Sequence, residues 1–358
     1  MSKFIQLHLL TSYPPANLNR DDLGRPKTAV MGGRQRLRVS SQCLKRTWRE
    51  STLFKEALSG HIGIRTKEMG PEIVERLVKG GRTENQALAA AKEITKEFGD
   101  REGSKEKQKK ANHHRHSQLV HYSPEERKAI HDLIEKLIEE ERDTRDDEIE
   151  LLRNKDHKAV DVGMFGRMMA NTPKYNTEAA VQVAHALSVH EAEVEDDFFT
   201  AVDDLNVRRD DSGAAHMGVK EFGAGLFYLY VCIDRDLLAD NLQSDENLIR
   251  KALRAITECA TRLAPSGMQN SFGSRAYANY VLAEKGDQQP RSLSVAYLNP
   301  VTEGGYLDAA IQKLEATRDK MDACYGACAD DRYVLNVHAG EGNLDELLNF
   351  VATTGSHA

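Results

Sequence analysis

Alternating and continuous apolar runs predict the strands of this chain. The segment from Phe4 to Leu10 (FIQLHLL) has the alternation of a half-buried strand, and Phe222 to Ile233 (FGAGLFYLYVCI) is apolar enough for a buried one. Shorter runs from Tyr277 to Ala283 and from Leu293 to Tyr297 predict two further strands.

Helical spacing of apolar residues predicts several helices. One begins after Ser40, whose hydroxyl is suited to capping a helix, and runs to about Leu58. Two others run from Glu178 to His190 and from Glu246 to Leu263. Strands and helices in this order predict an α+β fold of ferredoxin-like type with large insertions.

The helix after Ser40 separates two kinds of side chain, because successive residues are about 100° apart around its axis. Its apolar face consists of Leu44, Trp48, Phe54 and Leu58. Its polar face consists of Gln42, Lys45, Arg46 and Arg49. The first nearby glutamate is Glu50, so surface ion pairs along the helix do not account for all these cations.

The segment between the first strand and this helix, from Thr11 to Val39, is predicted to be a long loop. Prolines and glycines interrupt it repeatedly, and long loops inside compact domains commonly carry function. Between Arg20 and Arg49 the chain has nine Lys or Arg and two Asp, a local charge of +7 in a protein of formal charge −7. The other residues therefore sum to about −14. One basic segment on an acidic chain is typical of a site for a polyanion such as nucleic acid.

Three further segments have a recognisable character. Residues 60–153 are rich in charge, and their apolar residues have helical spacing. Residues 161–174 form a compact turn-like stretch that contains Met168. Residues 191–220 are predicted to form a long hairpin, with its tip at Arg208 to Gly213 and exposed apolar side chains on its arms.

Several classes of protein are excluded by what the sequence lacks. No stretch approaches the ~20 apolar residues of a membrane span, so we expect a soluble, cytoplasmic protein. The five cysteines have no paired spacing, and the sequence has no phosphate-binding glycine loop, nucleophile elbow or zinc-protease motif. Histidines 113, 114, 116 and 121 have no carboxylate or thiolate placed with them. We therefore expect no metal and no cofactor.

Two acidic pairs leave an alternative open. Asp21 and Asp22 lie inside the basic segment, and Asp203 and Asp204 lie in the predicted hairpin. A carboxylate among cations can hold Mg²⁺ or act as a base near a phosphodiester. It can also cap a turn or pair with arginine, and we favour this structural interpretation.

The basic segment resembles the CasC family, the Cas-seven-type backbone subunits of type I-E CRISPR Cascade complexes within the RAMP superfamily. The resemblance begins with Leu18 to Asp22 (LNRDD) and Gly32 to Arg46 (GGRQRLRVSSQCLKR). Further matches follow in family order: Gly166 to Met168, Phe199 to Asp204 (FTAVDD), Ala215 to Gly218, Gln269 to Phe272 (QNSF) and Pro290 to Ser294 (PRSLS). The least similar stretch runs from about Gly60 to Arg153.

The resemblance implies an architecture like a right hand. An RRM-like palm would comprise residues 1–59, 160–190 and 221–358, with a helical fingers insertion at 60–159 and a β-hairpin thumb at 191–220. It also implies the partners: the crRNA, the target DNA strand paired to that guide, neighbouring copies in a filament and other Cascade subunits, with no membrane.

The resemblance also implies roles for individual residues. The residues implied to contact RNA are Arg20, Lys27, Arg34, Arg36, Arg38, Ser40, Gln42, Lys45, Arg46, Arg49 and Arg167. Met168, Phe199, Thr200 and Met217 are implied to be wedge residues that kink the guide at intervals, although core packing is the alternative for Met168 and Phe199. Contacts to phosphates and 2′-hydroxyls give affinity without sequence preference.

Catalysis is not expected from this resemblance. Related backbone subunits of type III complexes cut target RNA with an acid in the first long loop, where this chain has Asp21 and Asp22. Type I-E members are regarded as non-catalytic, so the scaffold is our first hypothesis and a metal-dependent ribonuclease is the alternative.

Overall fold

The computed structural model describes residues 3–100, 115–153, 157–169, 173–201, 216–302 and 304–353. The chain forms two compact units. The first, the sheet unit, comprises Met1–Phe54, Gln182–Ile233 and Leu253–Ala358. The second, the helical unit, comprises Lys55–Val181 and Asp234–Ala252. The helical unit thus takes in residues 160–181, which the prediction assigned to the palm.

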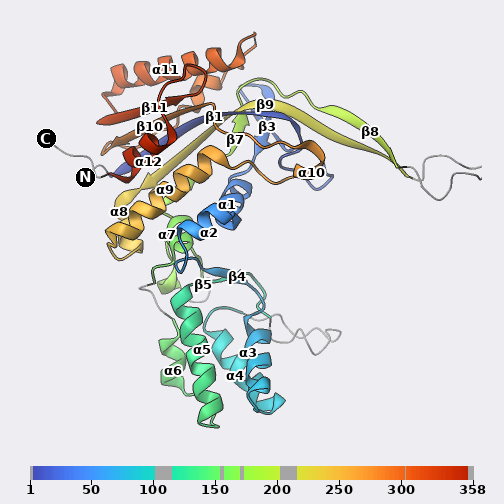
Figure 1. The fold of residues 1–358 in the computed structure, drawn as a ribbon, viewed down its shortest axis with the longest axis vertical. Coiled ribbons are helices and arrows are strands. Elements are labelled where there is room, and N and C mark those ends of the chain that lie inside the picture. The colour runs from blue at the N-terminus through green and yellow to red at the C-terminus, as the bar shows by residue number, and fades with distance from the viewer. Residues whose placement is uncertain are drawn as a thin grey trace, which may run out of the picture. The chain divides into compact units, whose positions relative to one another are not determined.

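The sheet unit is built on one large sheet with the strand order β11-β10-β1-β9-β7-β3-β2 (Figure 1). Its strands are β1 (Phe4–Ala16), β2 (Thr28–Met31), β3 (Arg34–Val39), β7 (Ala186–Ser188), β9 (His216–Asp234), β10 (Tyr280–Gly286) and β11 (Asp331–Asn336). Two more strands, β6 (Val181–Val183) and β8 (Glu195–Ala201), also pair with β9. The pairings of β10 with β1 and β11, of β3 with β2 and β7, and of β9 with β7 and β8 are antiparallel.

The sheet unit also contains helices of different lengths. They are α1 (Ser41–Glu50), α10 (Gln269–Phe272), η3 (Ser294–Tyr297), α11 (Tyr306–Tyr325) and α12 (Leu344–Ala352). The division between the units falls within α2 (Thr52–Ala57) and α9 (Glu246–Arg262), and α8 (Arg235–Asn241) belongs to the helical unit. Leu10, Tyr280 and Leu282 of the sheet are buried with Leu314 of α11 in one apolar cluster. Leu226 and Tyr228 of β9 belong to the same cluster, so this packing holds the strand from which the hairpin of β8 and β9 extends.

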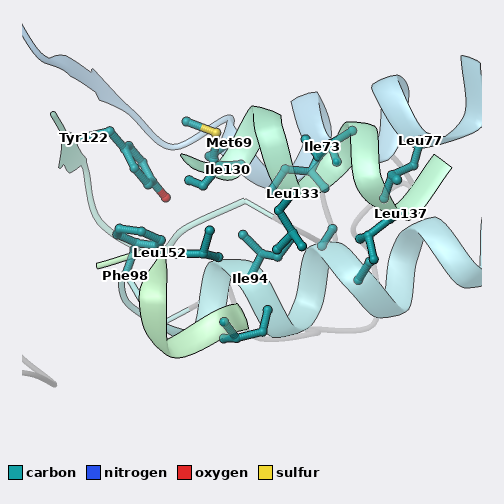
Figure 2. Close-up of a cluster of buried hydrophobic side chains, with 14 of the residues drawn as sticks. Met69, Ile73, Leu77, Ile94, Phe98, Tyr122, Ile130, Leu133, Leu137 and Leu152 are labelled. Carbon is teal, nitrogen blue, oxygen red and sulfur yellow. The ribbon is translucent and has the colours of Figure 1, made fainter. Parts of the chain in front are cut away.

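The helical unit has its own core, shown in Figure 2. Its elements are β4 (Ile64–Thr66), α3 (Met69–Lys79), α4 (Glu84–Lys96), β5 (Val120–Tyr122), α5 (Pro124–Glu139), α6 (Asp146–Leu151), α7 (Val160–Phe165) and η2 (Pro173–Tyr175). Ile73, Ile94 and Ile130, from three different helices, are completely buried in that core. The prediction of a helical region at 60–153 is confirmed for the described residues.

The α+β class is confirmed, and so are the strand at Phe222 to Ile233, the helix from Glu246 and the arms of the hairpin. The tip of the hairpin and Asp203 and Asp204 lie outside the described residues. Other predicted elements were wrong. The predicted helix from Glu178 to His190 is replaced by β6 and β7, the predicted strand at Leu293 to Tyr297 is the 3-10 helix η3, and the helix after Ser40 ends at Glu50.

Candidate nucleic-acid interface

Helix α1 begins at the capping residue that the sequence predicts. The Ser40 hydroxyl accepts a hydrogen bond from the backbone N–H of Cys43, and Leu44 and Trp48 are buried on one side of the helix. The first turn contains no acidic residue, so the positive end of the helix dipole is not neutralised there. The helix stops at Ser51, whose hydroxyl donates to the Trp48 carbonyl and accepts from the N–H of Phe54. A new short helix, α2, then starts.

The turn from Asn19 to Lys27 is closed by backbone hydrogen bonds and attached to α1. The Lys27 N–H donates to the Asn19 carbonyl at 2.8 Å, and the Asn19 side-chain oxygen accepts from the Ser40 N–H at 2.9 Å. The helix cap and the basic turn are therefore joined by direct hydrogen bonds. Arg20, at the start of the turn, is exposed.

Asp21 holds this turn together. Its carboxylate accepts hydrogen bonds from the backbone N–H groups of Leu23 and Arg25 and from the Arg25 side chain. The bond from the Arg25 backbone, with these other bonds, lowers the pKa of Asp21 below its usual value. A carboxylate engaged in this way caps a turn, as the structural interpretation expects. Asp22 is exposed beside it.

The second half of the predicted loop is a β-hairpin. Strands β2 and β3 pair from Thr28 with Leu37 to Met31 with Arg34, and Gly32 and Gly33 form the turn with positive φ. A side chain at Gly32 would collide with the Leu298 carbonyl, so only glycine fits there. The prediction of a long loop from Thr11 to Val39 was therefore wrong at both ends, because β1 continues to Ala16 and Arg34 and Arg38 lie on β3.

Three cationic side chains and a histidine lie near the start of α1. Lys27 and Arg38 line one small pocket with Asn19, and the Arg38 N–H donates to the Lys27 carbonyl. Burial, together with the charges of Arg38 and Lys27, lowers the pKa of His185, whose ring accepts from the Ser41 N–H. Lys27 and Arg46 both act electrostatically on the Cys43 thiol, although burial dominates and raises its pKa. The potential around this helix end is therefore positive.

The polar face of α1 extends this basic surface. Gln42 and Arg46 are exposed, and Lys45 and Arg49 are half-buried. Burial lowers the pKa of Lys45. Arg46 and Arg49 both approach Glu50, at 3.0 Å and 3.7 Å, so the acidic residue at the end of the helix partly balances them. We use the name basic surface for Arg20, Lys27, Arg34, Arg38, Lys45, Arg46 and Arg49.

Arg34 lies at the far end of β3 and forms an ion pair with Glu191 at 3.4 Å. Both side chains are more than half exposed, so this pair contributes little to stability and can exchange for another anion. Among the residues that the structure describes, no ion pair is found for Arg20, Lys27 or Arg38. These three are the members of the basic surface best placed to take an external anion.

Arg36 requires a correction, because it is completely buried. Its guanidinium donates to the carbonyls of Ser188 and Tyr297, at 3.1 Å and 2.9 Å. A buried cation that already satisfies backbone oxygens holds strand β3 to its surroundings. Arg34 and Arg36 share one face of β3, since they are two residues apart. Arg34 lies beside the exposed turn, whereas Arg36 lies further along the strand, where the carbonyls of Ser188 and Tyr297 surround its guanidinium, and this is the physical reason for the difference.

Arg167 also differs from the prediction. It belongs to the helical unit, is nearly inaccessible, and pairs with the equally buried Glu126 at 2.6 Å. It also donates to the His121 carbonyl, so it fixes the start of α5, where Glu126 forms a capping box with Ser123. The next residue, Met168, is 82% exposed, which excludes core packing for it within this chain.

The hairpin of β8 and β9 presents two different faces. Phe199 lies opposite Gly218, and Lys220 Nζ is 4.3 Å from the centre of the Phe199 ring. Residues directly opposite one another share a face, and successive residues alternate between faces. The face opposite Phe199 therefore carries Phe198 with Val219 and Thr200 with Met217. Phe198, Val219 and Met217 are each more than 60% exposed.

Sequence reasoning did not assign Phe198, Val219 or His185 to the site. The strand pattern around Phe199 contains the signal for the first two, because a side chain two positions from Thr200 must share its face. No local signal identifies His185. Within the described ranges, no cluster of three or more His, Cys, Asp or Glu could hold a metal, and no helix is long and apolar enough to cross a membrane.

The fold is similar to that of chains of CRISPR RNA-guided surveillance complexes. One is a chain of the structure described as "CRISPR RNA-guided surveillance complex, pre-nicking", which is 30% identical, with 97% of this chain and 100% of that chain covered and a TM-score of 0.79. A chain of another "CRISPR RNA-guided surveillance complex" shares the fold at 24% identity, with 97% and 99% covered and a TM-score of 0.70.

The family model described as "CT1975-like protein" matches residues 5–350, so this chain belongs to that family. The predicted resemblance to the CasC-type backbone subunits of Cascade is confirmed by these matches. Among curated proteins, no sequence matches the chain.

Proposed function

We propose that this protein is the guide-RNA-binding backbone subunit of a type I-E Cascade effector. The observation that carries the proposal is the basic surface, which joins a helix start, a closed turn and a strand within a family related to RNA-guided complexes. Cations on ordered elements can follow a sugar-phosphate backbone. Ser40 acts here as the helix cap, so its contribution to RNA would come through the helix end that it orders.

In this proposal the sheet unit serves as an RRM-like palm, the helical unit as the fingers and the hairpin of β8 and β9 as the thumb. The sheet and the long hairpin support this assignment, because the hairpin leaves the same strand, β9, that runs through the middle of the sheet (Figure 1). RNA bound to the palm would therefore contact a sheet that continues, through β9, into the root of the thumb.

The chemistry of the basic surface accounts for binding without sequence preference. Lys27, Arg38 and Gln42 offer hydrogen-bond donors that phosphates and 2′-hydroxyls can accept, and none of these groups distinguishes one base from another. A backbone subunit must accept any spacer sequence. The negative charge of the rest of the chain would discourage nucleic acid from binding elsewhere.

The hairpin would kink the guide by placing apolar side chains between bases. Thr200 and Met217 form one pair on a face that also carries Phe198 and Val219, and all four are exposed. Phe199 would contact the guide from the other face, and Met168 from the fingers. Apolar and aromatic groups stack on any base, which suits a wedge that must act at every spacer sequence.

Several copies would coat the spacer portion of the crRNA, each contacting its neighbour, and the segments between kinks would be ordered for pairing with the target DNA strand. Sequence reading would then belong to base pairing, while the protein supplies charge and shape. Other Cascade subunits would complete the assembly. This is a scaffold function in antiviral defence, and we propose no catalysis for it.

The engagement of Asp21 in its turn supports the absence of catalysis. Its oxygens accept three hydrogen bonds from within the turn, and its lowered pKa makes it a weak base. Incubation of the assembled complex with complementary RNA and Mg²⁺ tests this. We expect intact RNA. Periodic cleavage that disappears in Asp22→Asn would establish the ribonuclease instead. Asp21→Asn is the comparison variant, because it also weakens the hydrogen bonds that hold the turn.

Purification of the chain with its genomic neighbours tests the central proposal. The RNA that co-purifies should consist of repeat-flanked spacers, and micrographs of the particle should show a curved filament of repeated copies. If the RNA that co-purifies is instead a mixture of unrelated sequences, the chain is a general RNA-binding protein. A chain that carries Arg20→Ala, Lys27→Ala and Arg38→Ala together should recover much less RNA at equal expression.

A further inference from the structure

The loop around α10 is docked against the basic turn. Gly267 lies so close to the backbone of Leu18 and Asn17 that a side chain at position 267 would collide with both carbonyls. The loop therefore contacts the chain immediately before Asn19 and Arg20, where the basic surface begins. Glycine is required there by the close approach of two backbones.

The other end of the same loop is attached to the root of the hairpin. The Phe272 ring packs against Phe222 of β9, with ring centres 5.9 Å apart. Asn17 connects the two sides, because its side-chain amide donates to the carbonyls of Gly24 and Glu221, both at 2.9 Å. The loop thus contacts both the chain before the basic turn and the root of the hairpin.

The loop is internally ordered. Met268 and Gly273, on either side of α10, both have left-handed backbone, and the Gly273 N–H donates to the Gln269 carbonyl. The Ser274 hydroxyl, which is buried, donates to the Gln269 side chain at 3.3 Å. Gln269 and Ser274 therefore hold the loop in shape.

Asn270, Ser271 and Arg275 do not take part in this internal bonding. All three are exposed, and within the described part of the chain their side chains have no hydrogen-bond or ion-pair partner. An amide, a hydroxyl and a guanidinium on a rigid loop are the groups that commonly contact phosphates and sugars. The QNSF segment, which the basic surface and the hairpin do not include, supplies two of them.

We propose that Asn270, Ser271 and Arg275 form a further contact with the sugar-phosphate backbone of the guide RNA, between the basic surface and the hairpin. This inference rests on the proposed function. A strand that runs from α1 to the hairpin root passes the Asn17 and Leu18 backbone, on which this loop is docked. The loop would hold the guide next to the point where the hairpin kinks it.

The test measures binding of the full chain to a labelled single-stranded guide RNA over a range of salt concentrations. Asn270→Ala should weaken binding about three- to tenfold at every salt concentration, because a neutral hydrogen bond is lost. Arg275→Ala should weaken binding and also reduce the slope of log K against log salt by about 0.7, the value for one phosphate of a single strand. Lys320→Ala, an exposed cation on α11, is the matched control and should leave the slope unchanged.

Two outcomes would overturn the inference. If both loop variants bind guide RNA like the wild type while Lys45→Ala with Arg49→Ala binds more weakly, the loop is not a guide contact and the proposed function stands. If guide binding is unchanged but the assembled particle binds complementary DNA more weakly, the loop belongs to the target strand. If Lys45→Ala with Arg49→Ala also binds guide RNA like the wild type, the basic surface is not an RNA-binding site and the proposed function is contradicted.

Discussion

The ring of Phe199 occupies the space in which a side chain of Gly218 would lie. A β-carbon at position 218 would be 2.5 Å from Cζ of that ring and 2.7 Å from Cε1, so the two residues are matched across the hairpin. Glycine leaves room for the ring beside the opposite strand, and Lys220 Nζ lies 4.3 Å from the ring centre. The position of Phe199 is therefore set by a residue that has no side chain.

Gly218→Ala should displace the Phe199 ring without changing the charge of the protein. We expect the periodic protection of bound guide RNA from nuclease to become blurred, while the salt slope of binding stays at the wild-type value. Gly304→Ala is the matched control, because no atom lies near a side chain at that position. Protection that stays sharp in Gly218→Ala would show that the ring position is unimportant for the kink.

The two hairpin faces should act separately. Phe198→Ala with Met217→Ala removes exposed apolar groups from one face, and Phe199→Ala removes the ring from the other. Each should leave charge-driven binding largely intact, since no cation is lost, and should change a different band of the nuclease-protection pattern. An identical change in both variants would contradict separate contacts, and no change in either would end the wedge assignment.

Lys45→Ala with Arg49→Ala should weaken binding equally for guides of unrelated sequence. Removal of two cations from α1 should reduce the salt slope by about one to two units. The double variant Lys251→Ala with Lys320→Ala, which removes two exposed cations elsewhere, should keep the wild-type slope. An unchanged slope in the α1 variant would exclude these residues from phosphate contact.

Arg36→Ala should lower stability rather than RNA affinity. The substitution leaves a cavity and two buried carbonyls without their donor, a loss of roughly 2–4 kcal/mol in the free energy of unfolding. Urea denaturation measures this, with the exposed Arg20→Ala as the control that should stay within about 0.5 kcal/mol. If the Arg36→Ala protein is as stable as the wild type and its RNA binding has a reduced salt slope, Arg36 contacts RNA after all.

Acid should destabilise the sheet unit through His8. Burial lowers the pKa of His8, which lies between the Tyr228 hydroxyl and Glu284. Burial opposes the charge of Glu284, but hydrogen bonds from His8 and Arg291 hold its pKa well below the usual range, and Arg332 also donates to it. Below about pH 6.5 His8 becomes protonated in the unfolded chain but stays neutral in the folded protein. The free energy of unfolding therefore decreases as the pH is lowered.

The free energy of unfolding of His8→Gln should therefore depend less on pH than that of the wild type between about pH 7 and pH 5. The difference in slope is at most about 1.4 kcal/mol per pH unit, because one proton is involved. The loss through Glu284 begins only below about pH 4.5 and should persist in the variant. Parallel curves for the two proteins down to pH 5 would show that His8 does not titrate differently on unfolding.

The parts of the fold that local pattern determines could be predicted from the sequence. The cap of α1, its two faces and the apolar core of β9 depend on neighbours within a few residues. The hairpin of β2 and β3 was missed although Gly32 and Gly33 are a strong turn signal, because its polar alternation does not resemble a buried strand. The short strands β6 and β7 have apolar spacing that also fits a helix, and tertiary pairing decided between them.

The candidate site divides in the same way. Exposed cations such as Arg20 and Arg46 could be assigned from charge pattern alone. The burial of Arg36 could not, because its partners Ser188 and Tyr297 lie 152 and 261 residues away along the chain. The burial of Arg167 could not be predicted either, because its ion-pair partner Glu126 lies 41 residues before it in the chain. Only a folded structure reveals which cations of a basic segment are engaged internally.

The strict alternation along β8 limits how the length of this strand can change during evolution. Deletion of one residue between Glu195 and Phe198 would exchange the two faces, so that Phe199 would take the place of Phe198 opposite Val219 and lose the space that Gly218 provides. Removal of two residues would keep each side chain on its own face and shorten the reach of the arm. Homologous chains should therefore differ in the length of this arm by even numbers of residues.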